Sequence, residues 1–197
     1  MASYTHILEG FSLGFCHRNE LRCVLDETAG DTNILTLDPD ALISSGISVL
    51  AIDFDGVLAH HGAAIPLPEA ADWLKQCESV LGGDRIFILS NKPTYERIQW
   101  FAENFPALRF ISGVRKKPYP DGLIKVKELA EVTMSSILMI DDRLLTGCLA
   151  ALTAGARVCY IRRPYISFSH RPFSEMFFMV LRTLERIFVH TITVRNR

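Results

Sequence analysis

The stretch SVLAIDFDGVL, residues 48–58, joins a short apolar run to two carboxylates and a glycine. Its first six residues are typical of a buried strand, because Val, Leu, Ala and Ile dominate them. Asp53 and Asp55 are separated by one apolar residue, and the chain turns at Gly56. Two like charges this close at the end of a buried strand raise the cost of ionising each other, and a bound cation would remove that cost. Taken alone, such a short segment is more often an ordinary acidic turn.

Four more apolar runs predict further buried strands, at residues 86–90, 109–112, 137–141 and 157–161. Helical spacing is found between the runs, at residues 68–81, 94–104, 121–132 and 145–154. Strands that alternate with helices of this length predict right-handed βαβ units and a parallel sheet covered on both faces. The expected fold class is therefore α/β, a three-layer sandwich with a doubly wound parallel sheet.

Length and composition indicate one globular unit. The chain has 197 residues, of which 49% are hydrophobic and 22% are charged, as in a soluble domain of ordinary size. We expect residues 1–47 to form a lead-in, with a short helix that begins at the Asp38-Pro39 pair and ends near Ser45. Residues 48–165 are expected to form the core, and residues 166–197 a basic amphipathic helix and tail.

Cysteine usage and the N-terminus bear on the compartment. Five cysteines, an odd number without a CxxC pair, predict neither a disulfide framework nor a structural zinc site. The first 20 residues lack the basic start and the unbroken apolar run of a signal peptide. These features predict a cytoplasmic protein, and the C-terminal segment described below adds peripheral attachment to a membrane as an alternative.

Polar residues end or follow the other predicted strands as well. They are Ser90 and Asn91 after the second, Lys117 in the loop after the third, and Asp141 and Asp142 at the end of the fourth. In open α/β sheets, ligands bind beyond the carboxyl ends of the strands. Each residue has a simpler explanation by itself, as a helix cap, a surface charge or an acidic turn. Together with the first strand end, they predict one polar site at one edge of the sheet.

Taken in this order, the residues resemble the four motifs of the haloacid dehalogenase (HAD) superfamily of phosphohydrolases, which are DxD, Ser or Thr, Lys, and an acidic pair. The resemblance spans about residues 48–165. It implies that Asp53 is the nucleophile and Asp55 the general acid and base. It also implies that Ser90 and Lys117 hold the phosphoryl group, with Asn91 beside them at the substrate.

The resemblance also implies a Mg²⁺ site. Asp142, with Asp141 beside it, would complete this site together with Asp53 and the backbone carbonyl of Asp55. Carboxylate oxygens suit Mg²⁺, which binds through few carboxylates plus water and substrate phosphate. A carboxylate that attacks phosphorus splits one hard hydrolysis into two easier steps, and a lysine stabilises the charge on the transferring group. The residue types therefore fit Mg²⁺-dependent phosphoryl transfer.

A closer resemblance follows from the spacing of the motifs. Asp53 and Ser90 are 37 positions apart and Ser90 and Lys117 are 27 apart, so one helix and one strand nearly fill each interval and no cap domain fits. The chain is therefore similar to the capless type III branch and, within it, to the YqeG-like phosphatases, which include phosphatidylglycerophosphate phosphatases. It departs from their DxDNT motif at Gly56 and from their GDQxxTD motif at Gly147, where a second acidic residue is usual.

The C-terminal quarter of the chain is basic. Residues 1–142 contain 12 Lys and Arg against 20 Asp and Glu, whereas residues 143–197 contain 9 Arg against 2 Glu. Residues 173–192 have the pattern of an amphipathic helix and are too polar for a membrane span. The apolar face of this helix either packs on the α/β core or binds an anionic membrane surface, with Arg171, Arg195 and Arg197 at its flanks.

Two further pairs of residues are candidates for the site. Arg162 and Arg163 follow the fifth predicted strand, and they either meet a phosphorylated substrate or lie solvated on a loop. His60 and His61 follow the first motif and are expected to be exposed residues of a turn, with a flap that touches the substrate as the alternative.

The leading hypothesis is a phosphomonoester hydrolase that forms an aspartyl-phosphate, with Mg²⁺ as its cofactor. Its phosphorylated substrate would be phosphatidylglycerophosphate or another membrane-surface phosphate. A phosphatase of a soluble sugar, nucleotide or protein phosphate is the first alternative, and a catalytically inactive HAD-fold binding protein is the second. The retained motif residues argue against the second alternative. No nucleic-acid partner is expected.

Overall fold

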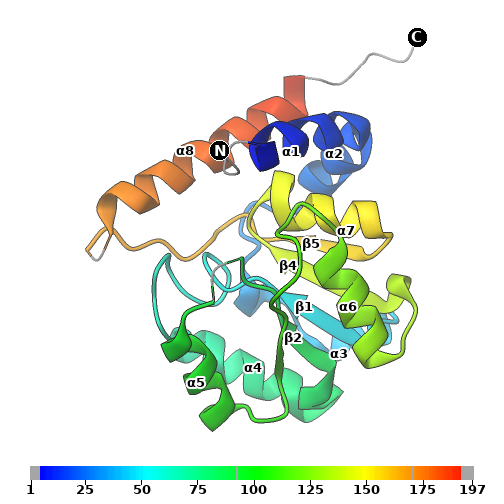
Figure 1. Cartoon of the computed structure of the whole chain (residues 1–197), viewed down its shortest axis with the longest axis vertical. Coiled ribbons are helices and arrows are strands. Elements are labelled where there is room, and N and C mark those ends of the chain that lie inside the picture. Colours follow the sequence, from blue (N-terminus) through cyan, green and yellow to red (C-terminus); the bar gives the residue numbers. More distant parts are fainter. Residues whose placement is uncertain (1–4, 92, 170, 192–197) are drawn as a thin grey trace.

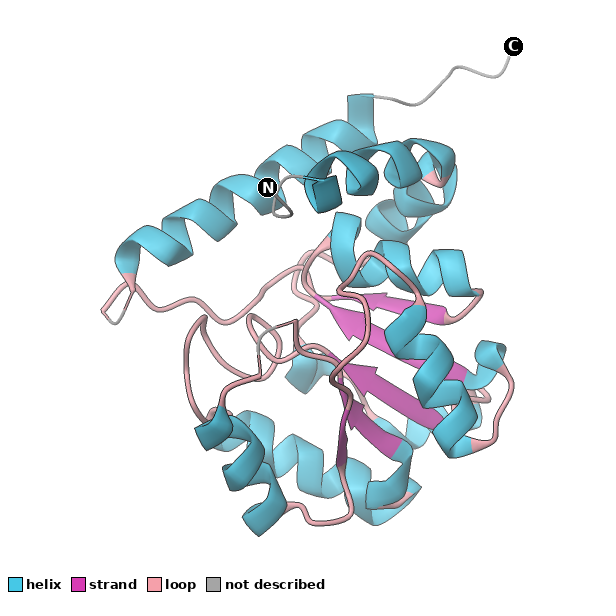
Figure 2. Ribbon diagram, in the orientation of Figure 1, coloured by secondary structure: helices cyan, strands magenta, loops and turns pink. Residues whose placement is uncertain are grey.

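A computed structural model describes residues 5–91, 93–169 and 171–191 of the chain (Figures 1 and 2). Within these ranges the strands are β1 (Val49–Ile52), β2 (Ile86–Ile88), β3 (Arg109–Phe110), β4 (Ile137–Asp141) and β5 (Arg157–Tyr160). They form one sheet in the order β3-β2-β1-β4-β5, and every neighbouring pair is parallel. The expected doubly wound parallel sheet is confirmed.

The order of the strands reverses beside β1. The chain runs outward from β1 through β2 to β3 and then returns to the other side of β1 with β4. The registers place Leu50 of β1 beside Ile86 of β2 and beside Leu138 of β4. In an open α/β sheet, such a reversal leaves a crevice beyond the carboxyl ends of the two central strands. Because Asp53 follows β1 and Asp141 ends β4, the topology brings the two acidic motifs together.

Helices cover both faces of the sheet and one of its edges (Figure 1). The α-helices are α1 (Thr5–Cys16), α2 (Arg18–Glu27), α3 (Pro39–Ser44), α4 (Pro68–Leu81), α5 (Tyr95–Asn104), α6 (Asp121–Ala130), α7 (Leu149–Ala154) and α8 (Pro172–Thr191). The shorter helical turns are η1 (Ile34–Thr36), η2 (Gly83–Arg85), η3 (Met134–Ser136) and η4 (Leu144–Cys148), of which η4 is a π-helix. Residues 53–67, between β1 and α4, form turns and loops without a helix.

The strands separate two hydrophobic cores. Leu50 and Ile52 of β1 belong to the core under α4 and α5, whereas Val49 and Ala51 belong to the core under α6 and α7. Successive side chains of a strand point to opposite faces, so a strand that is covered on both faces must be apolar throughout. All four side chains are fully buried. The three-layer sandwich is thus confirmed.

Local sequence signals set several helix boundaries. Asp38 caps α3 with Pro39 in the first turn, and α4 has the expected bounds. The helix expected over residues 145–154 instead begins with the wider turn η4, and α7 follows it. This wide turn places Gly147 directly against the carboxylate of Asp141. Single π-turns of this kind are frequent at functional sites.

The N-terminal helices α1 and α2 lie beside α7 and α8 near the β5 edge of the sheet (Figure 1). Arg162 and Arg163, which were expected at a substrate or in solvent, hold this segment to the core. Arg162 donates hydrogen bonds to the carbonyl oxygens of Leu25 and Thr28, and Arg163 donates to that of Gly30. Carbonyl groups at the end of a helix need such donors. Arg162 therefore anchors the end of α2, and Arg163 anchors the turn that follows it.

Helix α8 turns its charged face inward and most of its apolar face outward. Glu175, Arg182 and Glu185 are buried, whereas six apolar side chains are half or more exposed: Phe173, Met176, Phe177, Val180, Leu184 and Ile187. The expectation that the apolar face packs on the core is wrong for these residues. The buried charges find partners at the sheet edge, which offsets the cost of removing them from water. Arg195 and Arg197, expected at its flank, lie outside the described residues. None of the described helices has the length and apolar character of a membrane span.

Candidate active site

The strand ends place most of the expected residues around one cavity of about 280 Å³. Its lining includes the expected Asp53, Asp55, Asn91, Lys117 and Asp142, together with His61, Arg143, Thr146 and Phe178. Asp141 is fully buried and pairs with Lys117 at the edge of this cavity. Ser90 is the exception, because it lines a neighbouring cavity. The topology therefore assembles the predicted carboxylates and lysine but sets Ser90 to one side.

Lys117 connects two of the carboxylates. Its Nζ lies 2.7 Å from Oδ1 of Asp53 and 2.6 Å from Oδ2 of Asp141. Burial lowers the pKa of Lys117, but Asp141 and Asp53 outweigh that effect and raise the pKa above its usual value. The backbone N–H of Lys117 also donates to Oδ1 of Asn91 at 3.1 Å. A protonated amine is thus fixed between the ends of β1 and β4.

The carboxylates of this site are poorly solvated. Burial raises the pKa of Asp53 to about 8, because Lys117 only partly offsets the loss of water and the neighbouring negative charges. Burial also raises the pKa of Asp142 to about 6, and Arg182 is the main opposing charge. A divalent cation among these groups would favour their ionised forms.

The oxygen donors of the site fit a hard divalent cation. One oxygen from each of Asp53, Asp141 and Asp142 lies within 4.8 Å of the others. Oδ1 of Asp142 is buried, and no group in the described part of the chain forms a hydrogen bond with it. The ion pairs around the cavity contain six acidic side chains against four Lys and Arg side chains and one histidine: Asp53, Asp55, Asp141, Asp142, Glu175 and Glu185 against Arg97, Lys117, Arg143, Arg182 and His61. Acidic groups thus outnumber the Lys and Arg side chains around the cavity, and carboxylate oxygens are ligands that suit Mg²⁺.

Gly147 is explained by the position of Asp141. A Cβ atom at position 147 would overlap the carboxylate of Asp141. The carboxylate itself is held on both oxygens, since Oδ2 accepts from Lys117 and Oδ1 accepts from the backbone N–H of Arg143 at 2.9 Å. Position 147 therefore has no room for a side chain, because the carboxylate of Asp141 lies there.

Arg97 is a site residue that the motif analysis missed. It is only 1% exposed, and its guanidinium donates to both oxygens of Asp55, at 3.1 and 3.2 Å. It also donates to Oγ of Ser90 at 3.1 Å. The guanidinium carbon lies 3.5 Å from the centre of the Phe54 ring, a stacked arrangement that suits arginine. Arg97 thus orients Asp55 and links it to the end of β2.

Under the phosphatase function proposed below, replacing Arg97 by lysine should lower kcat for an aryl phosphate by about tenfold to a hundredfold, because one ammonium group cannot hold both oxygens of Asp55. The positive charge is retained, so KM should change less than kcat. Steady-state kinetics measure this split. Arg85→Lys is the matched control, since Arg85 donates to the carbonyl oxygen of Ala130 away from the site. An unchanged kcat in Arg97→Lys would show that Asp55 needs no such clamp.

Helix α8 and the loop after β1 close one side of the cavity. The rings of His61 and Phe178 are stacked with their centroids 3.9 Å apart, and the backbone N–H of His61 donates to Oε1 of Glu175 at 3.0 Å. His61 is buried, so the expectation that it is exposed is wrong. Burial, together with Arg182, lowers its pKa. The side chain of Asp53 remains 14% exposed.

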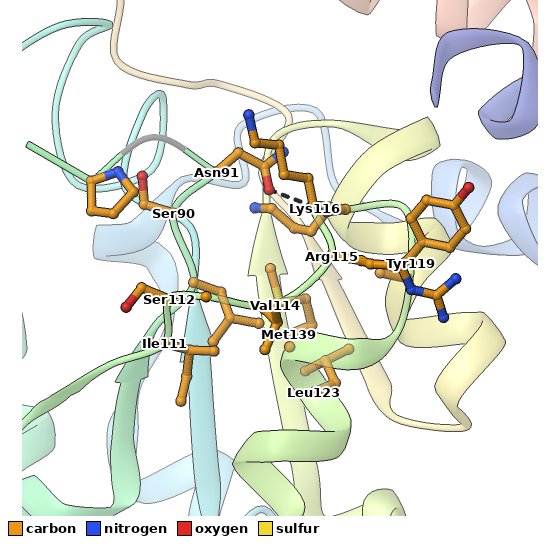
Figure 3. Close-up of a pocket in the computed structure, with 16 residues that line it drawn as sticks. Ser90, Asn91, Ile111, Ser112, Val114, Arg115, Lys116, Tyr119, Leu123 and Met139 are labelled. Carbon is orange, nitrogen blue, oxygen red and sulfur yellow. Dashed lines mark hydrogen bonds between the residues drawn. The ribbon is translucent and has the colours of Figure 1, made fainter. Parts of the chain in front are cut away.

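A second cavity, of about 190 Å³, is drawn in Figure 3. Asn91 and Lys117 line both cavities. The dashed line in Figure 3 marks the hydrogen bond between these two residues. The lining of this second cavity contains both apolar and polar side chains. The apolar ones include Leu89, Ile111, Val114, Leu123 and Met139, and the polar ones include Ser90, Ser112, Arg115, Lys116 and Tyr119. The second cavity thus extends the site toward α6, and its lining is largely apolar.

Comparisons with known proteins add two partial structural likenesses. No protein-family model and no curated protein matches the sequence. An uncharacterised protein from Corynebacterium glutamicum has 20% identity and a TM-score of 0.46, over 70% of this chain and 96% of that one. A HAD family enzyme from Bacteroides thetaiotaomicron, crystallised with magnesium and inorganic phosphate, has 17% identity and a TM-score of 0.41, over 63% of this chain and 98% of that one. Both likenesses concern the fold.

Proposed function

We propose that the protein is a Mg²⁺-dependent phosphomonoester hydrolase of the HAD type that acts through an aspartyl-phosphate. The observation that supports this function most is the meeting of three strand-end groups at one cavity. These groups are the Asp53 and Asp55 pair, Lys117, and the Asp141 and Asp142 pair. Hydrolysis of an aryl phosphate by the wild-type protein and by an Asp53→Asn variant tests the reaction class.

In this proposal Asp53 is the nucleophile and Asp55 the general acid and base. An oxygen of Asp53 attacks phosphorus, the bond from phosphorus to the leaving oxygen breaks, and Asp55 gives a proton to that oxygen. Asp55 then takes a proton from a water molecule, which attacks phosphorus, releases inorganic phosphate and restores Asp53. Arg97 donates to both oxygens of Asp55 and so keeps its ionised form in place for the second step.

The remaining residues stabilise charge. Lys117 and Asn91 face the cavity and bind the oxygens of the phosphoryl group, with Ser90 beside them. Asp53, Asp142 and the backbone carbonyl of Asp55 would hold Mg²⁺, with Asp141 next to them. When bound, the ion neutralises the substrate phosphate and allows an anionic nucleophile to approach it.

We also propose that the substrate phosphate is carried at a membrane surface, as in phosphatidylglycerophosphate. The support is the apolar outer face of α8, which continues onto α1. The ring of Phe11 packs on Phe188 of α8 with centroids 5.1 Å apart, and Phe11 and Phe15 are 38% and 49% exposed. Large exposed apolar patches mark interaction surfaces.

The charge of this region favours an anionic bilayer as the partner. Two basic side chains lie beside this apolar face: Arg18, at 4.7 Å from the ring centre of Phe15, and the exposed Arg171 just before α8. An amphipathic helix with basic flanks binds in the plane of the headgroups. Because Phe178 and Arg182 on the inner side of α8 adjoin the site, a bound helix would bring the cavity close to lipid phosphates.

A Phe173→Glu/Phe177→Glu variant should bind anionic vesicles at least about tenfold more weakly than the wild type. Two aromatic side chains that would enter the bilayer are lost, and the two new negative charges are repelled by the anionic headgroups. Both residues are more than half exposed, so the fold should persist. Co-sedimentation with phosphatidylglycerol-containing vesicles at low and high salt measures binding, which added salt should weaken. Tyr95→Glu/Ile98→Glu on α5, where both side chains are also exposed, is the matched control.

Two outcomes would contradict the membrane proposal. If the wild type ignores anionic vesicles even at low salt, a soluble phosphate becomes the better substrate class. If sedimentation velocity shows a dimer that dissociates in Phe173→Glu/Phe177→Glu, and no vesicle binding is found, the apolar face belongs to a second copy of the chain.

A further inference from the structure

The inner face of α8 touches a candidate metal ligand. Arg182 is 4% exposed, and its Nε and Nη2 lie 2.6 and 2.5 Å from Oδ2 of Asp142. The reaction proposed above gives this arginine no role. A buried guanidinium in this position either competes with the cation for Asp142 or holds Asp142 ready for it.

The contacts of Asp142 favour the second alternative. Arg182 engages Oδ2, while Oδ1 is buried and forms no hydrogen bond with any described residue. Asp142 is also one of the three carboxylates whose oxygens cluster within 4.8 Å. Groups that bind metals are commonly oriented by a partner that holds their other polar atom. Arg182 leaves one oxygen of Asp142 available in this way.

Gly56 provides the space for this contact. Its φ is +88°, and a Cβ atom there would overlap Oδ2 of Asp142 and lie 3.0 Å from Nη2 of Arg182. The loop after β1 therefore approaches Asp142 too closely for any larger residue at position 56. Glycine at position 56, where the DxDNT pattern has Asn, therefore leaves room for the pair that Asp142 forms with Arg182.

Neighbouring charges fix α8 in this position. Glu185 pairs with Arg143, the residue that follows Asp142 in the chain, and accepts from the backbone N–H of Leu144 at 3.0 Å. Glu175, in the first turn of α8, accepts from the backbone N–H of His61. Both glutamates are buried, so these contacts are protected from water. Arg182 is thus held between two anchors.

We propose that Arg182 is a positioning residue that orients Asp142 for binding of the divalent cation, which makes α8 a part of the metal site. The inference rests on the proposed function, since it needs a cation at Asp142.

Titration of Mg²⁺ into the metal-free, full-length protein by calorimetry tests the proposal. Arg182→Gln should raise the Kd for Mg²⁺ by about tenfold to a hundredfold, because Asp142 loses the partner that orients it. Arg182→Lys should raise it less, by at least about threefold, because one ammonium group does not fix the plane of a carboxylate. Arg186→Gln is the matched control. Arg186 lies one turn further along α8 and donates to Oη of Tyr160, so its loss should leave the Kd unchanged.

The outcomes separate this proposal from the one on which it rests. Unchanged binding in both Arg182 variants overturns it, and tighter binding in Arg182→Gln identifies Arg182 as a competitor of the cation. If circular dichroism shows that Arg182→Gln does not fold, the Kd of Arg182→Lys decides, and an unchanged value overturns the proposal. If the wild type itself binds no Mg²⁺, the proposed function fails together with the role of Arg182.

Discussion

Replacing Asp53 by asparagine should abolish the Mg²⁺-dependent hydrolysis of an aryl phosphate, with a loss in kcat of at least about a thousandfold. An amide is not a competent nucleophile toward phosphorus, so the acyl phosphate cannot form. The variant also removes one of the three anionic oxygens that cluster at the site, so Mg²⁺ should bind more weakly. Phosphate release at several Mg²⁺ concentrations and in excess chelator measures both effects.

The matched control for this experiment is Asp72→Asn. Asp72 is exposed on α4, where it pairs with Lys75, and its loss should leave turnover unchanged. Circular dichroism of Asp53→Asn separates lost chemistry from lost folding. Turnover that persists in Asp53→Asn, or in the wild type with excess chelator, would contradict the aspartyl-phosphate mechanism.

Replacing Lys117 by methionine should lower the free energy of unfolding in the absence of Mg²⁺ by about 3–5 kcal/mol. The variant leaves Asp53 and Asp141 without the amine that lies 2.7 and 2.6 Å from their oxygens. Asp141 is fully buried, so water cannot replace the lost partner. Urea unfolding followed by circular dichroism measures the change. Phosphatase activity should be lost as well, because the amine that we propose to bind the phosphoryl group is gone.

The stability loss in Lys117→Met should be smaller near about pH 6 than near about pH 9. Burial raises the pKa of Asp53 to about 8 in the folded protein, so at the lower pH the folded state holds a proton that the unfolded state releases. In the wild type that proton is lost as the pH rises. Lys117 then pairs with an ionised Asp53 only at the higher pH, so its removal costs more there.

Lys116→Met is the matched control for the lysine variant, because Lys116 is the exposed neighbour of Lys117. Its free energy of unfolding should stay within about 0.5 kcal/mol of the wild-type value. A Lys117→Met protein as stable as the wild type at both pH values would show that the bridge between the two carboxylates contributes nothing.

The fold and the carboxylate cluster could be predicted because both depend on local patterns. Short apolar runs alternate with helical segments, and parallel strands all end at the same edge of a sheet. Asp53 and Asp141 directly follow or end two such runs. No long-range contact had to be known to bring them together.

Arg97 is the site residue that the sequence motifs did not predict. Arg97, Phe101 and Phe105 recur every four residues, which places an arginine on the buried face of α5. This signal could have marked Arg97 as a residue that needs a buried acceptor. Its acceptor, Asp55, lies 42 positions away, and only the assembled core brings the two side chains together.

Helix α8 shows the division most clearly. The sequence by itself determined its amphipathic pattern, as it determined the sheet and the acidic strand ends. Only the tertiary structure decided that the charged face of α8 meets the core and that Arg182 lies on Asp142. The physical reason is that apolar surface can be buried against almost any apolar surface, whereas a charge can be buried only where an oriented partner is already in place. Those partners exist only after β1 and β4 have come together.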